Sequence, residues 1–454
     1  MWRLAGLVLV AGALAACGGD RSDLSSQLGG DLTRDDASKN AFGLAAPTLT
    51  NEERRLFEIG DSFFTKNWVT APSSTKARDG LGPVLNAQAC SSCHVLDGRG
   101  LTPDGDDGGL GLLVRLSIPG DAGGAPLAEP RYGGQLQDQS ILGVPAEGRI
   151  EITYEPVRGA YDDGTPYVLR RPTYRISDLA FGPLVPGTML GPRIAPQMVG
   201  MGLLEAVPTE TILGLADPTD ENDDGVSGRP NWIEDSRTGT RRLGRFGWKA
   251  NVATVEEQTA GAFHGDIGIT SPFHPEQDCT PVQRACRAAP QGGSPEIQDE
   301  VLDAVTFYAS TLAVPALRDV NDPEVRKGAR LFEELGCAAC HTSTLVTGTS
   351  TIPSLVDQTI HPYTDLLLHD MGPGLADGRP DVRATGREWR TAPLWGIGLV
   401  DEVNRRRDLL HDGRARTIEE AILWHGGEAE RSRKQFLASA EANRNSIIRF
   451  LESL

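Results

Sequence analysis

The chain contains 454 residues with a formal net charge of −18 at pH 7, and 39% of its residues are hydrophobic. This length accommodates two or three domains, and the 53 glycines and 30 prolines indicate many loops. The acidic balance argues against nucleic acid as a partner, because phosphate binding requires clustered positive charge.

The N-terminus has the pattern of an export signal. Arg3 precedes an apolar run over residues 4–14, which is too short to span a bilayer as a stable helix. Leu14-Ala15-Ala16-Cys17 then resembles a bacterial lipoprotein cleavage box, in which Cys17 becomes the lipidated first residue. The alternative is an ordinary secretory signal in which Cys17 has no role. We expect residues 1–17 to be a lipoprotein signal peptide.

This signal predicts where the protein resides. A lipid on Cys17 would attach it to a membrane on the periplasmic side of the cell envelope, and Gly18, in place of Asp, favours the outer membrane. Residues 18–46 are polar and small, so we expect them to form a flexible tether.

A helix is predicted ahead of each of two cysteine motifs. Thr50 and Glu53 form a capping box, and apolar residues at helical spacing continue to Phe64, ahead of Cys90-Ser91-Ser92-Cys93-His94. The same order recurs where a helix from Pro323 leads into Cys337-Ala338-Ala339-Cys340-His341.

The pattern C-x-x-C-H is the attachment signature of a c-type haem. Two thiols at this spacing form thioether bonds to the vinyl groups of one porphyrin, and the histidine supplies an axial nitrogen to the iron. A zinc site would need four clustered ligands, and a thioredoxin-like pair does not require the histidine. We therefore predict two covalently bound haem c groups, one on Cys90, Cys93 and His94 and one on Cys337, Cys340 and His341.

The remaining patterns predict the fold. Apolar and polar residues alternate over residues 150–154 and 167–176, on either side of Asp162-Asp163-Gly164, which predicts a β-hairpin or small sheet. Further helices are predicted over residues 295–312 and near the C-terminus. We therefore expect a mainly α fold with two cytochrome c-like domains, residues 47–312 and 313–454, and a β-containing insertion in the first.

Two further motifs concern a disulfide and a metal. Cys279 and Cys286 are expected to form a local disulfide in an oxidising compartment, and two free thiols are the alternative. Asp220, Asn222 and Asp224, followed by a glycine, resemble the start of an EF-hand calcium loop. The closing glutamate of such a loop is missing, so a solvated acidic turn is the alternative to a calcium ion.

Seven further segments stand out: Gly202-Leu203-Leu204-Glu205-Ala206-Val207-Pro208, Gly247-Trp248-Lys249-Ala250, Gly265-Asp266-Ile267-Gly268-Ile269-Thr270, Asp365-Leu366-Leu367-Leu368-His369-Asp370-Met371-Gly372, Arg390-Thr391-Ala392-Pro393-Leu394-Trp395, His411-Asp412-Gly413-Arg414 and Trp424-His425-Gly426-Gly427-Glu428-Ala429. They resemble segments of the bacterial di-haem cytochrome c peroxidases and MauG-like enzymes, and more particularly of the related di-haem oxidoreductase family that is often labelled peroxidase or thiol oxidoreductase. This resemblance runs from about residue 50 to the C-terminus.

The resemblance implies catalytic roles. Trp248 falls on the tryptophan that bridges the two haems in the peroxidases, although it is alternatively an ordinary core residue. The distal glutamate of those enzymes falls on Gly268, a departure. His264 and Asp266 are the nearest groups that can move protons, and Asp266 is favoured.

The resemblance also concerns the axial ligands. The peroxidases place a methionine directly before the His-Asp-Gly motif, but here that residue is Leu410, which cannot bind iron. His425 is the favoured replacement, because two glycines after it allow close approach to a porphyrin, and His369 and Met371 are its rivals. The first iron has Met198, Met201 or no sixth ligand.

These expectations together describe a di-haem oxidoreductase. By the resemblance, a small electron-donor protein reduces the second haem, and the first reduces peroxide or oxidises another small substrate. The alternatives are a non-catalytic electron carrier with both irons six-coordinate and an accessory redox subunit of an envelope complex.

Overall fold

The structure, a computed structural model, describes residues 24–103, 110–120, 125–235 and 237–454. Cys17 lies outside this range. The helices are α1 Asn51–Thr65, α2 Cys90–Cys93, α3 Met201–Ala206, α4 Thr209–Leu213, α5 Val255–Ile267, α6 Arg284–Arg287, α7 Asp299–Ser310, α8 Pro323–Glu334, α9 Gly372–Leu375, α10 Val400–Asn404, α11 Ile418–Trp424, α12 Glu430–Ala438 and α13 Glu441–Ser453.

The strands are short, apart from one hairpin. They are β1 Thr33–Arg34, β2 Val84–Leu85, β3 Leu112–Ser117, β4 Gln139–Ser140, β5 Arg149–Ala160, β6 Pro166–Ser177, β7 Met189–Ile194, β8 Trp232–Glu234, β9 Arg241–Leu243, β10 Val314–Pro315, β11 Leu345–Val346, β12 Thr359–Ile360, β13 Leu368–Asp370 and β14 Glu388–Arg390. In the described residues they pair as seven two-stranded sheets.

Two helix crossings lie beside the two cysteine motifs. Helix α1, with the expected Thr50–Glu53 capping box, packs on α7, and α8 packs on α13. Each crossing is closest at a glycine: a Cβ added at Gly60 would clash with the carbonyl oxygen of Ala304, and one at Gly328 with that of Ser446. The helices that precede both motifs are therefore held by close backbone contact.

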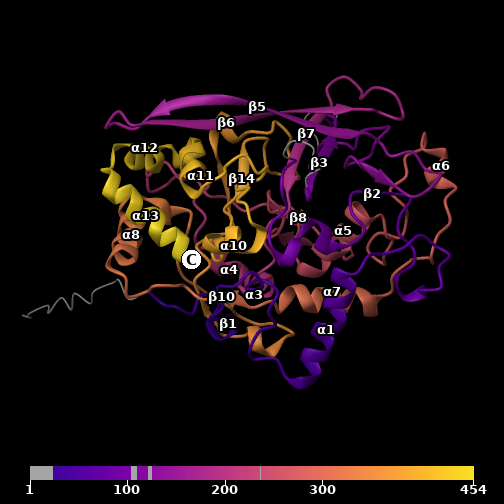
Figure 1. Cartoon of the computed structure of the whole chain (residues 1–454), viewed down its shortest axis with the longest axis horizontal. Coiled ribbons are helices and arrows are strands. Elements are labelled where there is room, and N and C mark those ends of the chain that lie inside the picture. The colour runs from indigo at the N-terminus through magenta and orange to yellow at the C-terminus, as the bar shows by residue number, and fades with distance from the viewer. Residues whose placement is uncertain (1–23, 104–109, 121–124, 236) are drawn as a thin grey trace, which may run out of the picture.

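The predicted hairpin is confirmed as β5–β6. Its strands pair from Arg149 opposite Ser177 to Ala160 opposite Pro166, with the turn at the expected Asp162-Asp163-Gly164. Figure 1 shows this hairpin lying along the top of the molecule, from the region of β3 and β7 to α12. At its tip Tyr161 packs against Phe436 of α12.

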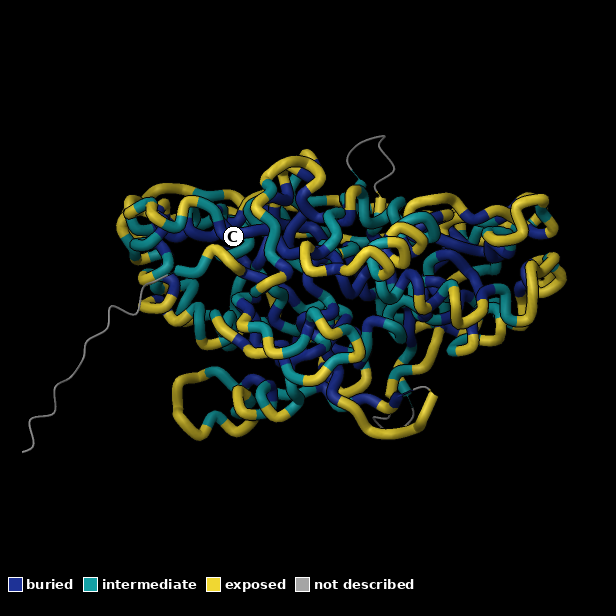
Figure 2. Tube along the Cα trace, turned by 90° about the horizontal axis from the view of Figure 1, so that it is seen from below, coloured by how far each residue is buried: buried dark blue, intermediate teal, exposed yellow. Residues whose placement is uncertain are grey.

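The predicted fold class is wrong. The structure is 31% helical and 19% strand with many small sheets, so it is not mainly α, and it gives no clear evidence of two cytochrome c domains. Strands of two or three residues in glycine- and proline-rich loops leave no alternation to detect. In addition, the main cluster of buried hydrophobic residues includes side chains from Leu28 to Leu454, and Figure 2 shows buried chain, in dark blue, across the molecule.

The expected tether is largely part of this core. Leu28, Leu32 and Phe42 are fully buried, and β1 pairs in parallel with β10, at Thr33 opposite Val314. Residues 24–46 are therefore not a free tether. Their mostly small and polar composition predicted a linker, because only a few apolar residues bind the segment to the core. In the described part of the chain, no helix is long and apolar enough to cross a membrane.

Candidate functional site

Each cysteine motif lines a cavity of its own. Cys90, Cys93 and His94 line a cavity of about 440 Å³, which we call the first cavity. Cys337, Cys340 and His341 line a second cavity of about 200 Å³. Four thiols are free of disulfides, as thioether formation requires.

The two motif histidines have the same environment. The Nδ1 of His94 lies 2.8 Å from the carbonyl oxygen of Pro196, and that of His341 lies 2.9 Å from the carbonyl oxygen of Tyr363. Since a carbonyl only accepts, Nδ1 carries the proton and Nε2 keeps its lone pair, as an iron ligand needs. Burial lowers the pKa of both imidazoles to about 4, so both are neutral near pH 7.

The preceding helices position these histidines. Phe64 of α1 packs against the His94 ring at 6.2 Å between centroids, and Phe332 of α8 packs against His341 at 6.1 Å. Burial raises the pKa of Cys90 and of Cys337 to about 12, so both are neutral thiols. Paired thiols and a neutral imidazole beside each cavity fit a haem.

Both cavities share one wall. Six residues line both of them: Arg99, Gln197, Trp248, Arg390, Ala392 and Pro393. The indole of Trp248 donates a hydrogen bond to the carbonyl oxygen of Ile194 at 2.8 Å, which fixes the ring. The residue expected to connect the two haem sites therefore lies where the cavities meet, although its role stays a prediction.

The two expected acid–base residues both line the first cavity, at the C-terminal end of α5. Asp266 accepts a hydrogen bond from Gln135 Nε2 at 2.9 Å, and burial raises the pKa of its carboxyl. His264 stacks on His274 at 4.7 Å, and its Nε2 lies 3.0 Å from the carbonyl oxygen of Glu276. The structure thus brings both groups to the cavity that contains Cys90 and Cys93.

Gly268 has a structural reason to differ from the peroxidase glutamate. It ends α5 with a φ of 73°, and its N–H donates to the carbonyl oxygen of Phe263. A Cβ there would lie 2.6 Å from the carbonyl oxygen of Val84. A side chain is therefore sterically excluded at this position.

The candidate axial ligands of the second cavity have different surroundings. Leu410, His425, His369 and Met371 all line it. The Nδ1 of His425 lies 2.7 Å from the carbonyl oxygen of Ala421, the same arrangement as in the motif histidines. This bond leaves Nε2 of His425 free to accept a metal bond.

His369 is occupied at both ring nitrogens. Nε2 lies 2.8 Å from Asp365 and Nδ1 lies 2.7 Å from Glu428. Burial alone would lower the pKa of His369, but the bonds to the two carboxylates raise it well above its usual value. An imidazole that is protonated and hydrogen-bonded at both ring nitrogens has no lone pair for iron. Met371 therefore remains as the rival of His425. Met198 and Met201 line the first cavity.

The calcium prediction gains no support. The Asp220 carboxylate and the Asn222 amide oxygen both accept hydrogen bonds from the Asp224 N–H at 3.0 Å. In the ranges that the structure describes, no group of three or more His, Cys, Asp or Glu side chains is arranged to hold a metal ion. These side chains therefore close an acidic turn.

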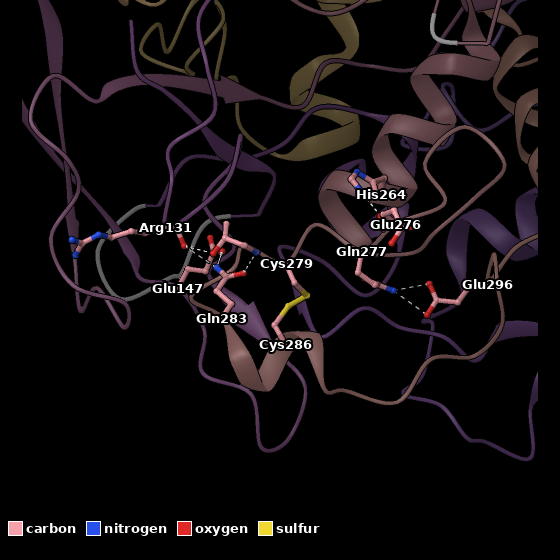
Figure 3. Close-up of a disulfide and its surroundings, with 10 residues drawn as sticks. Arg131, Glu147, His264, Glu276, Gln277, Cys279, Gln283, Cys286 and Glu296 are labelled. Carbon is pink, nitrogen blue, oxygen red and sulfur yellow. Dashed lines mark hydrogen bonds between the residues drawn. A yellow bond between two sulfur atoms is a disulfide. The ribbon is translucent and has the colours of Figure 1, made fainter. Parts of the chain in front are cut away.

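The disulfide prediction is confirmed, because Cys279 and Cys286 are bonded, with their Cα atoms 5.8 Å apart. Figure 3 shows the disulfide beside the bonds that Gln283 makes to Glu147 and Gln277 makes to Glu296. The loop that it closes begins beside Asp278, which lines the first cavity.

Sequence reasoning missed Arg99, Gln197 and Arg390. Arg390 stands in one of the segments that carry the family resemblance, which was a usable signal. Arg99 had none, because its partner Leu410 is 311 positions away in the chain.

Two cavities, each with paired thiols and a neutral histidine, define a protein with two haem sites. The chain belongs to the family described as di-haem oxidoreductase, putative peroxidase, which matches residues 24–108 and 119–454. A comparison with curated proteins finds no match.

Proposed function

We propose that this di-haem oxidoreductase carries two covalently attached haem c groups and moves electrons from the second cavity, through Trp248, to a small substrate in the first. The observation that carries this proposal is the position of Trp248 in the wall shared by both cavities. When bound, the haems supply the one-electron chemistry of their irons. A small electron-donor protein is the proposed source of electrons.

Peroxide is the proposed substrate. Reduction of one hydrogen peroxide to two waters consumes two electrons and two protons. Asp266 and His264 line the first cavity and are the proposed proton donors there. The raised pKa of the buried Asp266 carboxyl favours a protonated acid, which this role needs.

A second candidate is an electron carrier without catalysis. Met198 and Met201 both line the first cavity, so a thioether is available as a sixth ligand there. Two six-coordinate irons would pass electrons without binding substrate. An accessory redox subunit of an envelope complex would instead copurify with a partner protein.

The deciding experiment is optical and EPR spectroscopy of the haem-loaded protein, oxidised and half-reduced, with and without hydrogen peroxide. We expect one high-spin iron whose spectrum changes on addition of peroxide. Two low-spin irons that ignore peroxide in both states would reject the peroxidase function and leave the carrier.

For the second haem we propose His425 as sixth ligand, supported by its Nδ1 bond to the carbonyl oxygen of Ala421 at 2.7 Å. His425→Met should raise the reduction potential of that haem, because a thioether favours ferrous iron more than imidazole does. Met371→Leu is the matched control and should leave the low-spin signal unchanged. Loss of that signal in Met371→Leu alone would transfer the role to Met371.

The proposed location is the periplasmic side of the outer membrane, with a lipid on Cys17. It is supported by the order of basic residue, apolar run and small residues before Cys17.

A further inference from the structure

Most of the buried cations that the structure describes have a carboxylate partner. Arg193 and Lys249 share Asp377, at 2.7 Å and 3.4 Å, and Arg414 lies 2.7 Å from Asp412. Such pairing is expected, because a buried charge without a counter-charge is strongly destabilising.

Arg99 lacks such a partner. Its side chain is buried, with 5% of the residue exposed. The guanidinium donates only to uncharged acceptors: the Gln197 amide oxygen at 2.9 Å, the Leu410 carbonyl at 3.0 Å and the Asp408 carbonyl at 3.1 Å. Among residues that the structure describes, no carboxylate lies within 4.0 Å of it.

Arg390, which is half-buried, is the second case. Its Nε donates to the carbonyl oxygen of Gly247 at 3.0 Å, and one terminal nitrogen donates to the carbonyl oxygen of Thr391 at 3.1 Å. Again, no described carboxylate is within ion-pair distance. A guanidinium has five N–H donors, so each of these arginines retains donors for a further partner.

Arg245 shows that a buried arginine can be satisfied without a carboxylate. It donates to the carbonyl oxygens of Leu204, Glu205 and Val207 and to the hydroxyl of Thr209. The three carbonyl acceptors lie at the C-terminal end of α3, where the helix dipole favours a cation. Unlike Arg245, Arg99 and Arg390 line both cavities.

The two arginines flank Trp248. The Arg99 guanidinium carbon lies 5.6 Å from the centroid of the indole. The backbone N–H of Arg390 donates to the Trp248 carbonyl at 2.9 Å, and its guanidinium donates to the carbonyl of the preceding residue, Gly247. Two guanidinium groups that form no ion pair with a described carboxylate thus lie in the wall between the two cavities. A haem brings carboxylates on the side of the porphyrin away from its vinyl groups, which the cysteines bind.

We propose that Arg99 and Arg390 bind the carboxylate groups of the haems, and so orient both porphyrins toward Trp248. The inference rests on haem attachment at both motifs. Each pair would be a charge-assisted hydrogen bond, often bidentate for arginine, in a buried setting. Because a cation near the iron disfavours the ferric form, the same contacts raise the reduction potentials.

The test is a redox titration of the haem-loaded full chain, monitored by absorbance, with Arg99→Gln and Arg390→Gln. At a fixed applied potential we expect each substitution to raise the ferric-to-ferrous ratio of at least one haem about tenfold. Arg99→Lys and Arg390→Lys keep the charge and should restore most of the parent ratio.

Arg433→Gln is the matched control. Arg433 lines the second cavity but already pairs with Glu430 at 2.7 Å, so its loss should change the ratio much less. Ratios that move no more in the Arg99 and Arg390 variants than in this control, at equal haem content, would overturn the proposal. Absence of haem from the parent protein would instead reject attachment at the motifs.

A crystal structure of the parent protein with haem provides the second measurement, in case the variants do not fold. We expect both guanidinium groups within hydrogen-bond distance of haem carboxylates. Haem carboxylates that face solvent or other side chains would overturn the proposal.

Discussion

Asp97 is a buried carboxylate three residues after His94. The hydroxyl of Tyr308 in α7 donates to it at 2.7 Å, which links the first motif to the helix crossing beneath it. Burial raises the pKa of Asp97 to about 7, and the bond from Tyr308 opposes this shift only in part. The folded protein therefore binds a proton here that the unfolded chain has already released.

The stability of the protein should reflect this proton. The pKa of Asp97 is about 7 in the folded protein and near 3.8 in the unfolded chain. The free energy of unfolding that the bound proton contributes is therefore fully present at low pH, and it is lost as the pH rises from the unfolded to the folded pKa. The slope is at most about 1.4 kcal/mol per pH unit. Asp97→Asn should remove it, as measured by urea unfolding of the haem-loaded protein from pH 4.5 to 7.5.

Tyr308→Phe is the companion variant. Without the hydroxyl donor, the pKa of Asp97 should rise further, so the loss of stability should extend to higher pH. Identical pH profiles for the parent protein and Asp97→Asn would show that Asp97 ionises normally in the fold.

At this scale the sequence identified the residues whose chemistry depends on near neighbours. The C-x-x-C-H motifs and the Cys279–Cys286 pair are local, so spacing alone predicted them. The doubly bonded state of His369 was not predictable, because Glu428 reaches it from 59 positions away.

The two helix crossings depend on glycine at the element scale. Gly60→Ala and Gly328→Ala should each destabilise the protein by about 1–3 kcal/mol, because the added methyl group forces the helices apart. Glu58→Ala, on the exposed side of α1, is the control and should change stability by less than about 0.5 kcal/mol. Equal thermal unfolding temperatures for all three variants would show that the crossings tolerate a wider spacing.

The β5–β6 hairpin holds the loop that carries Leu410 and His411 into the second cavity. Arg170 of β6 donates to the carbonyl oxygens of Arg414 and Gly413, both at 2.9 Å, and its guanidinium lies 3.3 Å from Asp408. These bonds connect a surface hairpin to the wall of a haem site.

Arg170→Met should therefore cost about 1–3 kcal/mol and increase amide hydrogen exchange over residues 408–414. Arg175→Met in the same strand is the control, because the Arg175 side chain is 77% exposed and its ion pair with Glu151 is long, at 3.8 Å. Unchanged exchange in Arg170→Met would mean that the loop is held by its other contacts.

Sequence patterns predicted elements that are long or capped, and missed those that are short. The capping box of α1 and the hairpin were both visible, because each repeats a local rule over many residues. Strands β1 and β10 have two residues each, and their paired residues lie 281 positions apart in the sequence. No local sequence pattern therefore predicts them.

At the scale of the whole molecule, one main core crosses the proposed boundary at residue 312. The first and second motifs, 247 positions apart, line cavities with a common wall. Two domains were expected because a helix followed by a C-x-x-C-H motif occurs twice in the sequence. This repeated order does not show whether the two units have separate cores or share one. The division into residues 47–312 and 313–454 stays a prediction.

Lipid attachment can be tested on the full chain. Cys17→Ala should move the protein from the membrane fraction to the soluble fraction, with its haem spectrum unchanged, because the motifs are remote from the signal. Fractionation followed by haem staining measures this. A variant that stays with the membrane after a carbonate wash would contradict a lipid on Cys17.

The burial of the N-terminal segment limits how far Cys17 can lie from the folded protein. Leu28 and Leu32 fix the chain in the core, and only Gly18 to Asp23 separate Cys17 from Leu24. Seven residue steps reach at most about 25 Å when fully extended. A lipid on Cys17 would then hold the protein close to the membrane, with the face that carries Leu24 turned toward it. A soluble donor protein would have to approach from the sides or from the opposite face.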